Sequence, residues 1–176
     1  KKMSNQKIAV MGYGVVGSGV VEAFYNSLDG INRKINESAD IKYILDIVEH
    51  KSTGFDEKFI SDFEIIVNDP EITVVAEVIG GVNPAYEFTK RCLEAGKSVV
   101  TSNKELVAKH GTELLGIAKE KNINYLFEAS VGGGIPIIRP LYSSLVSNEL
   151  TDVVGILNGT TNYILTQMIK EGASFE

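Results

Sequence analysis

The chain is poor in the residues that build disulfides, zinc sites and membrane spans. One cysteine, Cys92, occurs in 176 residues, so an internal disulfide is excluded, and this suits the reducing cytoplasm in which we expect the protein. The two histidines, His50 and His110, are not part of any His/Cys/Asp/Glu set with zinc-ligand spacing. No apolar run reaches the roughly 18 residues that a membrane-spanning helix needs, so we expect no membrane partner.

Basic residues are also too few and too scattered for a nucleic-acid partner. Lysine and arginine together number 17 against 23 aspartates and glutamates, which gives a formal net charge of -6. Neutralising phosphates requires clustered basic side chains, and the sequence has no such cluster. A hydrolase triad is not indicated either, because no G-x-S-x-G segment occurs. A small-molecule substrate is the partner that these patterns favour.

Short apolar runs alternate with helical patterns over the first 128 residues. We expect strands at 7–11, 41–46, 73–79, 98–101 and 124–128, and helices at 15–24, 84–95 and 105–121. Three connecting stretches have a less regular apolar pattern. We predict a loop or frayed helix end at 28–40, one or two helical turns at 56–63, and a weak strand or connector at 65–67. The alternation predicts an α/β fold with a Rossmann-type doubly wound parallel sheet.

The pattern changes after Glu128, where three consecutive glycines at 132–134 suggest a hinge. Beyond them we expect a helix at 135–146, a strand at 152–157 and a helix at 162–170. One strand between two helices cannot cover its own apolar faces. The sequence therefore predicts two domains: a dinucleotide-binding domain at 5–130, and the start of an incomplete α+β substrate and dimerisation domain at 131–176.

A glycine-rich segment follows the first predicted strand. Gly12, Gly14 and Gly17 form a G-x-G-x-x-G pattern, and we call residues 12–17 the glycine loop. Val15 and Val16 begin the predicted helix. Gly12 would allow the tight turn, Gly14 the approach of a pyrophosphate, and Gly17 the close packing of helix on strand. The helix N-terminus would present free N–H groups to the phosphates. A glycine-rich turn without a ligand is the alternative, whereas a P-loop is excluded because no Gly-Lys-Ser or Gly-Lys-Thr continues this segment.

An acidic residue at the end of the second strand can bind the ribose hydroxyls of a dinucleotide, and Asp46 is the candidate. It lies 29 residues after Gly17, beyond the usual spacing of about 20, so residues 28–40 would have to be an insertion. Asp46 would favour NAD over NADP, since it repels a 2′-phosphate. Glu49 competes for this role, and a solvent-exposed carboxylate at the strand end is the other interpretation.

Four further segments carry a family resemblance. They are Glu77-Val78-Ile79-Gly80-Gly81, Thr101-Ser102-Asn103-Lys104, Glu128-Ala129-Ser130-Val131-Gly132-Gly133-Gly134-Ile135-Pro136 and Asn158-Gly159-Thr160-Thr161-Asn162-Tyr163. In this order, after an N-terminal G-x-G-x-x-G, the chain resembles homoserine dehydrogenases from about Lys7 to its end. The last two segments are far more specific than the glycine loop.

The resemblance implies an NAD- or NADP-dependent oxidoreductase, usually a dimer, that interconverts L-homoserine and L-aspartate 4-semialdehyde. This reaction belongs to threonine, methionine and isoleucine biosynthesis. The resemblance places Lys104 beside nicotinamide and substrate as the catalytic lysine, adds Gly80 and Thr101 as cofactor contacts, and places Gly159 and Thr160 at the substrate. An ammonium at Lys104 could polarise a carbonyl or deliver a proton. A solvated surface lysine is the alternative.

The resemblance also implies a monovalent cation, Na⁺ or K⁺, near the glycine hinge. The matching positions are Glu128, Val131, Gly133 and Ile135, which would offer a carboxylate and main-chain carbonyls. Without the family resemblance, Glu128 would be interpreted as a helix-capping or surface carboxylate. The family places an aspartate and a lysine further along the chain than Glu176. We therefore expect the 176-residue chain to bind a dinucleotide more readily than it turns over substrate.

Two other functions remain open at this stage. The chain could be a dehydrogenase of another small substrate, although a semialdehyde dehydrogenase would need a cysteine nucleophile at a strand end, and Cys92 lies in a predicted helix. It could also be a non-catalytic dinucleotide-binding module.

Overall fold

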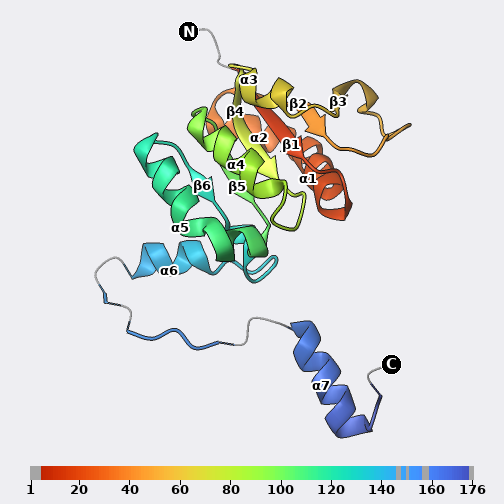
Figure 1. Ribbon diagram of the computed structural model, residues 1–176, viewed down its shortest axis with the longest axis vertical. Coiled ribbons are helices and arrows are strands. Elements are labelled where there is room, and N and C mark those ends of the chain that lie inside the picture. The colour runs from red at the N-terminus through yellow and green to blue at the C-terminus, as the bar shows by residue number, and fades with distance from the viewer. Residues whose placement is uncertain (1–4, 146–147, 150, 156–158, 175–176) are drawn as a thin grey trace. The chain divides into compact units, whose positions relative to one another are not determined.

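The computed structural model describes residues 5–145, 148–149, 151–155 and 159–174 (Figure 1). The strands are β1 (Asn5–Met11), β2 (Ser38–Leu45), β3 (Phe59–Ile60), β4 (Ile72–Glu77), β5 (Ser98–Thr101) and β6 (Tyr125–Leu126). The α-helices are α1 (Val15–Asn26), α2 (Leu28–Ile35), α3 (Glu64–Asn68), α4 (Ala85–Glu94), α5 (Lys104–Glu120), α6 (Ile138–Ser144) and α7 (Gly159–Glu171). Two 3₁₀ turns, η1 (Asp56–Lys58) and η2 (Glu128–Ser130), complete the regular structure. The chain divides into two compact units between Ser130 and Val131.

The six strands form one parallel sheet in the order β3-β2-β1-β4-β5-β6. This order confirms the predicted Rossmann-type doubly wound sheet. From β1 the chain adds strands toward one edge of the sheet, and from β4 it adds them toward the other edge, so the boundary between β1 and β4 is the switch point of the sheet. Ligands of such sheets bind at the carboxyl ends of the strands beside the switch point.

Alternate residues of each strand supply two separate cores, one on each face of the sheet. Ala9 and Met11 of β1 pack with the residues of α3, α4 and α5, whereas Val10 between them packs with Val21 of α1 and Ile44 of β2. All five side chains are fully buried. Helices cover both faces of the central strands, so consecutive residues of these strands are buried. This explains why their sequences are unbroken apolar runs.

The stretch at 28–40, expected to be a loop or frayed helix end, instead contains helix α2 and the start of β2. Apolar side chains are sparse in α2, so its helical pattern was weak. Tertiary contacts hold it in place: Asn32 Oδ1 accepts a hydrogen bond of 2.9 Å from the N–H of Ala39 in β2. Asn36 ends the helix in the left-handed conformation, with φ of 55°.

The expectations for residues 56–67 were only partly right. The predicted helical turn is present as η1, but it leads directly into the short strand β3, which was missed. Residues 65–67, expected to be a strand or connector, lie in helix α3. Packing overrides the β-branched composition there, since Ile66 is fully buried and the ring of Phe63 stacks on Phe88 at 4.0 Å.

Helix boundaries differ from the predicted ones at two caps. Helix α4, expected from residue 84, begins at Ala85, and Pro84 occupies the cap position without a side-chain cap hydrogen bond. Helix α5 begins at Lys104, and its cap is Asn103, whose Oδ1 accepts from the N–H of Leu106 at 3.1 Å. Asn103 satisfies one of the orphan N–H groups that begin every helix.

In the second unit the two predicted helices are present with shifted ends. Helix α6 begins at Ile138, three residues later than expected, and α7 begins at Gly159, three residues earlier. The strand expected at 152–157 is wrong for 152–155, which have no regular secondary structure, and 156–157 lie outside the described residues. Across the described ranges, no helix combines the length and apolar character that crossing a membrane requires.

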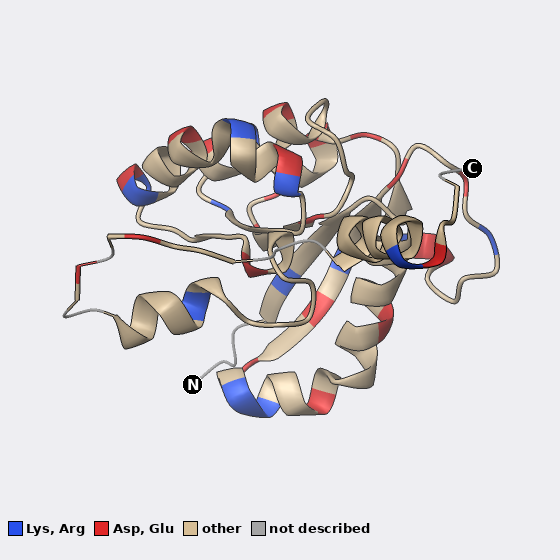
Figure 2. Cartoon of the chain, turned by 90° about the horizontal axis from the view of Figure 1, so that it is seen from below, with Lys and Arg blue, Asp and Glu red and all other residues tan. Residues whose placement is uncertain are grey.

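Acidic and basic residues are intermixed along the surface helices (Figure 2). One group of them is partly buried at the start of β2: Asp40 accepts from Lys7 Nζ at 3.0 Å, Lys58 Nζ at 3.2 Å and the hydroxyl of Tyr25 at 3.1 Å. These bonds join β1, α1 and η1 to the second strand. Burial alone would raise the pKa of Asp40, but hydrogen bonds from Lys7 and Lys58 outweigh it and lower the pKa.

We predict that Asp40→Asn lowers the free energy of unfolding by about 1 kcal/mol at pH 7. A carboxyl whose pKa is lowered by folding stabilises the fold above its unfolded pKa of about 4, and this contribution is lost as the pH falls through the folded pKa. Urea denaturation at pH 7 and at successively lower pH measures the effect, and the difference between the two proteins should shrink as the pH falls below about 4. Equal stability at pH 7 would contradict the prediction.

Candidate functional site

The carboxyl ends of the strands meet in one row, and the predicted site residues follow directly after them. Met11 pairs with Leu45 on one side and with Glu77 on the other, Glu77 pairs with Thr101, and Leu45 pairs with Ile60. The loops that leave these five residues therefore begin at the same edge of the sheet. That edge is where a doubly wound sheet binds its ligands.

The glycine loop crosses this edge between β1 and α1. Gly12 has φ of +100°, and a Cβ there would lie 2.8 Å from the carbonyl oxygen of Val78, so the turn requires glycine. A Cβ on Gly17 would lie 2.0 Å from the carbonyl oxygen of Gly12, so the helix can pack on the loop only without a side chain. Gly14, by contrast, faces open space: no described atom lies within 4 Å of a Cβ built there. Val15, the first residue of the helix, is 93% exposed.

Asp46, directly after β2, holds the glycine loop from the neighbouring strand. Its Oδ2 accepts from the N–H of Tyr13 at 2.7 Å, and its Oδ1 accepts from the N–H of Val48 at 2.9 Å. His50 Nε2 lies 3.4 Å from Oδ2, and hydrogen-bond geometry is not met there. The side chain of Asp46 is only 13% exposed, so it is not a solvated strand-end carboxylate. Helix α2 accounts for its unusual spacing from the glycine loop.

Ionisation of Asp46 is favoured by these contacts. Burial alone would raise the pKa of the carboxyl, but the N–H groups of Val48 and Tyr13, together with His50, outweigh burial and lower the pKa. The carboxylate therefore stays charged at neutral pH and keeps acceptor capacity, because each carboxylate oxygen can accept more than one hydrogen bond.

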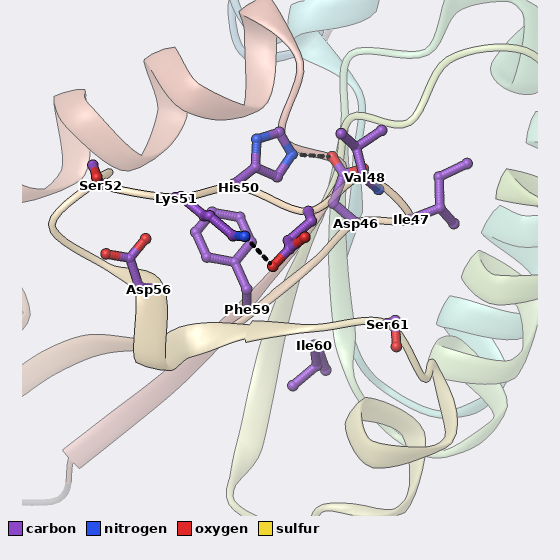
Figure 3. A pocket seen from close by; sticks show the side chains of 11 residues that line it. Asp46, Ile47, Val48, His50, Lys51, Ser52, Asp56, Phe59, Ile60 and Ser61 are labelled. Carbon is purple, nitrogen blue, oxygen red and sulfur yellow. Dashed lines mark hydrogen bonds and ion pairs between the residues drawn. The ribbon is translucent and has the colours of Figure 1, made fainter.

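An open pocket of about 540 Å³ lies beside Asp46, at the ends of β2 and β3 (Figure 3). Its lining residues are Asp46, Ile47, Val48, Glu49, His50, Lys51, Ser52, Asp56, Phe59, Ile60 and Ser61. Three carboxylates and one ammonium face this space, and the ammonium, on Lys51, pairs with Glu49 at 3.0 Å. Ile47 is 94% exposed. A pocket of this size, with an apolar side chain and convergent polar groups, fits part of a small molecule.

Lys104 stands on the other side of the switch point, as the first residue of α5, and it is exposed. Its neighbour Asn103 donates from Nδ2 to the carbonyl oxygen of Gly81 at 2.5 Å. Helix α5 is thereby tied to the turn that follows β4, in which Gly80 and Gly81 have φ of +85° and +68°. Sequence reasoning named Asn103 within a motif but gave it no role. An Asn directly before a helical pattern was the available signal.

Two other expected site residues, Gly80 and Thr101, lie at this edge in different settings. Gly80 follows β4, and a Cβ built on it would meet no described atom within 4 Å. Thr101 ends β5 and is 3% exposed, with its hydroxyl donated to the buried carboxylate of Glu77 at 2.5 Å. The side chain of Thr101 is therefore turned toward the interior.

The expected cation and substrate residues are divided between the two units. Glu128 lies in η2 at the end of the first unit, whereas Val131, Gly133 and Ile135 lie in the second. Gly159 and Thr160 form the exposed first turn of α7. Both assignments remain predictions from the family resemblance.

Cys92 has no nucleophilic role in this structure. It lies in α4 with no exposed surface, and burial raises the pKa of its thiol to about 12. A reactive thiol needs access and a lowered pKa, so the semialdehyde-dehydrogenase alternative lacks its nucleophile in this chain.

Two family models match the chain. Residues 12–128 match the NAD-binding domain of homoserine dehydrogenase, and residues 136–176 match the homoserine dehydrogenase model that describes the following domain.

Individual relatives carry the same name. The chain is 40% identical over 173 residues to homoserine dehydrogenase from Bacillus subtilis, covering 97% of this chain and 40% of that protein. The structure of a homoserine dehydrogenase from Thiobacillus denitrificans superposes with a TM-score of 0.89 at 35% identity, covering 98% of this chain and 41% of that one. Homoserine dehydrogenase from S. aureus gives a TM-score of 0.79 at 33% identity, with 98% and 41% covered. The chain thus spans about two fifths of the length of these relatives, and with its glycine loop, sheet order and matched segments it belongs to the homoserine dehydrogenase family.

Proposed function

We propose that the protein containing this chain oxidises L-homoserine to L-aspartate 4-semialdehyde, and catalyses the reverse reduction, with a nicotinamide dinucleotide. The observation that carries the proposal is the edge of the sheet. A glycine loop with an open helix N-terminus lies on one side of the switch point, and an exposed lysine, Lys104, begins a helix on the other.

The glycine loop fits a pyrophosphate. Gly12 and Gly17 draw the loop and helix together, while Gly14 leaves the space in front of the first turn open. The N–H groups of Val15, Val16 and Gly17 begin α1, and no carboxylate side chain occupies its first turn. A dianionic pyrophosphate would accept from these groups and gain from the helix dipole.

The preference for NAD over NADP follows from Asp46 and its surroundings. The charged carboxylate would accept from the ribose hydroxyls, and it would repel a 2′-phosphate. Glu49 and Asp56 add negative charge to the pocket, and Lys51 is already paired with Glu49. We place the adenosine side of the dinucleotide here, with the exposed Ile47 as an apolar contact.

We predict that Asp46→Ser lowers the NAD-to-NADP preference, measured as the ratio of kcat/KM values, by about 10- to 100-fold, because one charge-assisted hydrogen bond is lost and one repulsion is removed. Glu57→Gln is the matched control, since it removes an exposed carboxylate of η1 that does not line the pocket, and it should change the ratio less than about threefold. An unchanged ratio in Asp46→Ser would assign the preference to other residues.

The reaction removes a hydride from C4 and a proton from the hydroxyl of homoserine. A nicotinamide bound at this edge would supply the hydride acceptor. Lys104 acts on the oxygen: in the reductive direction its ammonium polarises the semialdehyde carbonyl and gives a proton to the forming alkoxide. In the oxidative direction the neutral amine takes that proton back.

Other parts of the proposal rest on the family resemblance. Gly159 and Thr160 contact the substrate, while Glu128 and the carbonyls of Val131, Gly133 and Ile135 bind Na⁺ or K⁺. These are hard oxygen donors, which suit such a cation. The full-length protein acts as a homodimer in the cytoplasm.

The proposal is tested by adding L-homoserine to the full-length protein with NAD or NADP and following reduced nicotinamide by its absorbance. A homoserine-dependent increase is expected. If the folded protein binds a dinucleotide and gives no increase with either cofactor, the function is that of a binding module or of a dehydrogenase with another substrate.

A further inference from the structure

We propose that the buried carboxylate of Glu77 is a positioning residue, which acts through Thr101 and Asn103 to fix Lys104 at the edge of the sheet. The inference rests on the proposed function, because it assigns a partner to the lysine of that reaction. Glu77 itself reaches neither the cofactor nor the substrate.

The position of Glu77 is costly for a carboxylate. It ends β4, the strand next to the switch point, and has no exposed surface. Met11, the residue paired with it on β1, is a fully buried apolar side chain. Among the ion pairs of the described residues, none includes Glu77. A buried acid without a cationic partner is poorly explained by stability, since apolar residues of similar volume often serve as well or better.

The hydrogen bonds of Glu77 point to the edge of the sheet. Oε1 accepts from the N–H of Ile79 at 2.9 Å, which fixes the start of the turn containing Gly80 and Gly81. Oε2 accepts from the hydroxyl of Thr101 at 2.5 Å. The hydroxyl of Thr101 thereby donates its one proton to Glu77. The Oγ1 atom of Thr101 can then accept a hydrogen bond from another donor.

That oxygen accepts from the N–H of Asn103 at 2.9 Å, and the side chain of Asn103 continues the chain of bonds in two directions. Its Oδ1 caps α5 at Leu106, and its Nδ2 returns to the carbonyl oxygen of Gly81. The turn after β4 and the N-terminus of α5 are therefore joined through three buried side chains.

Lys104 follows Asn103 directly, so this network fixes its backbone. The side chain of Lys104 is exposed and long, so the positions that its ammonium can reach depend on where α5 begins. A displacement of about 1 Å at a reacting group can cost roughly 100-fold in rate. Glu77 accepts hydrogen bonds from both Thr101 and Ile79, and these bonds fix the position at which α5 begins. An apolar side chain cannot make them.

The test compares Glu77→Gln with Asp69→Asn in the full-length protein. Asp69 is a partly buried carboxylate just before β4, at the opposite end of the strand, where it pairs with Lys42. Glu77→Gln should lower kcat for homoserine oxidation about 10- to 100-fold, and it should change the dissociation constant of NADH less than kcat, because the glycine loop and Asp46 lie on other elements. Asp69→Asn should leave kcat within about threefold, whatever it does to the melting temperature.

A second pair separates positioning from packing. Thr101→Val removes the hydroxyl between Glu77 and Asn103, and Thr101→Ser keeps it. Thr89→Val is the matched control, because Thr89 is also fully buried and its hydroxyl has no partner among the described residues. We expect a loss of kcat in Thr101→Val, recovery of most of it in Thr101→Ser, and wild-type kcat in Thr89→Val.

A readout independent of activity is amide hydrogen exchange in peptides covering 101–107. Glu77→Gln and Thr101→Val should speed exchange there about 5- to 10-fold, as expected for a weakened helix cap, and Asp69→Asn should not. The inference is overturned if kcat and local exchange in both variants match the wild type, or if they change only together with the global melting temperature. An inactive wild type would refute the proposed function, while the exchange comparison would still decide whether Glu77 fixes the start of α5.

Discussion

Replacing Gly17 with alanine is expected to weaken dinucleotide binding about 100-fold, which corresponds to roughly 2.7 kcal/mol of lost charge-assisted hydrogen bonding. A Cβ on Gly17 would lie 2.0 Å from the carbonyl oxygen of Gly12. Either the loop or the helix must move by about 1 Å to relieve this contact, and overpacking of this kind also lowers stability by about 1–3 kcal/mol. The N–H groups of the first turn would then no longer converge on the pyrophosphate. Fluorescence titration with NADH measures the affinity.

Gly19→Ala is the control for this substitution. Gly19 lies in the same helix, is exposed, and a Cβ on it would meet no described atom within 4 Å. Its replacement should leave NADH affinity unchanged and raise helix stability by up to about 1 kcal/mol. If Gly17→Ala bound NADH as tightly as the wild type, the loop would not be the pyrophosphate site.

Removing the amine of Lys104 is expected to have the largest effect on catalysis. Lys104→Ala should lower kcat by about 10²- to 10⁴-fold, which is the usual contribution of a positioned acid or base. NADH affinity should change little, because the glycine loop and Asp46 lie on other elements. Steady-state assays with homoserine, together with NADH titration, separate the two quantities.

Lys109→Ala provides the comparison within the same helix. Lys109 is exposed and pairs with Glu105 at 2.7 Å, one turn further from the edge of the sheet. Its replacement should leave kcat within about threefold of the wild type. A Lys104→Ala enzyme with full turnover would assign the acid–base role to another residue.

The sheet and its central strands could be predicted from the sequence because burial on both faces leaves apolar runs. The runs at β1, β4 and β5 stand out from the helical patterns between them, and glycines follow the first two. The G-x-G-x-x-G spacing also located the loop at the switch point. These features follow from local chemistry, namely periodicity and the need for positive φ at Gly12.

The elements that sequence reasoning missed depend on tertiary contacts. Helix α2 has a sparse apolar pattern and is held to β2 by Asn32. Helix α3 forms from β-branched residues because the buried Ile66 and Phe63 pack under α4. Glu77 was recognised within a motif, but its burial and its bond to Thr101 appear only when β4 and β5 are paired.

We expect the carboxyl edge of this sheet to bind a nicotinamide dinucleotide across the glycine loop and Asp46. The measurement that tests it most directly is a fluorescence titration of the full-length protein with NADH and with NADPH, repeated on Gly17→Ala and Gly19→Ala. We predict saturable binding that is at least about 10-fold tighter for NADH, about 100-fold weaker in Gly17→Ala and unchanged in Gly19→Ala. Folded wild-type protein that binds neither dinucleotide, or whose binding is equally strong in both glycine variants, would contradict it.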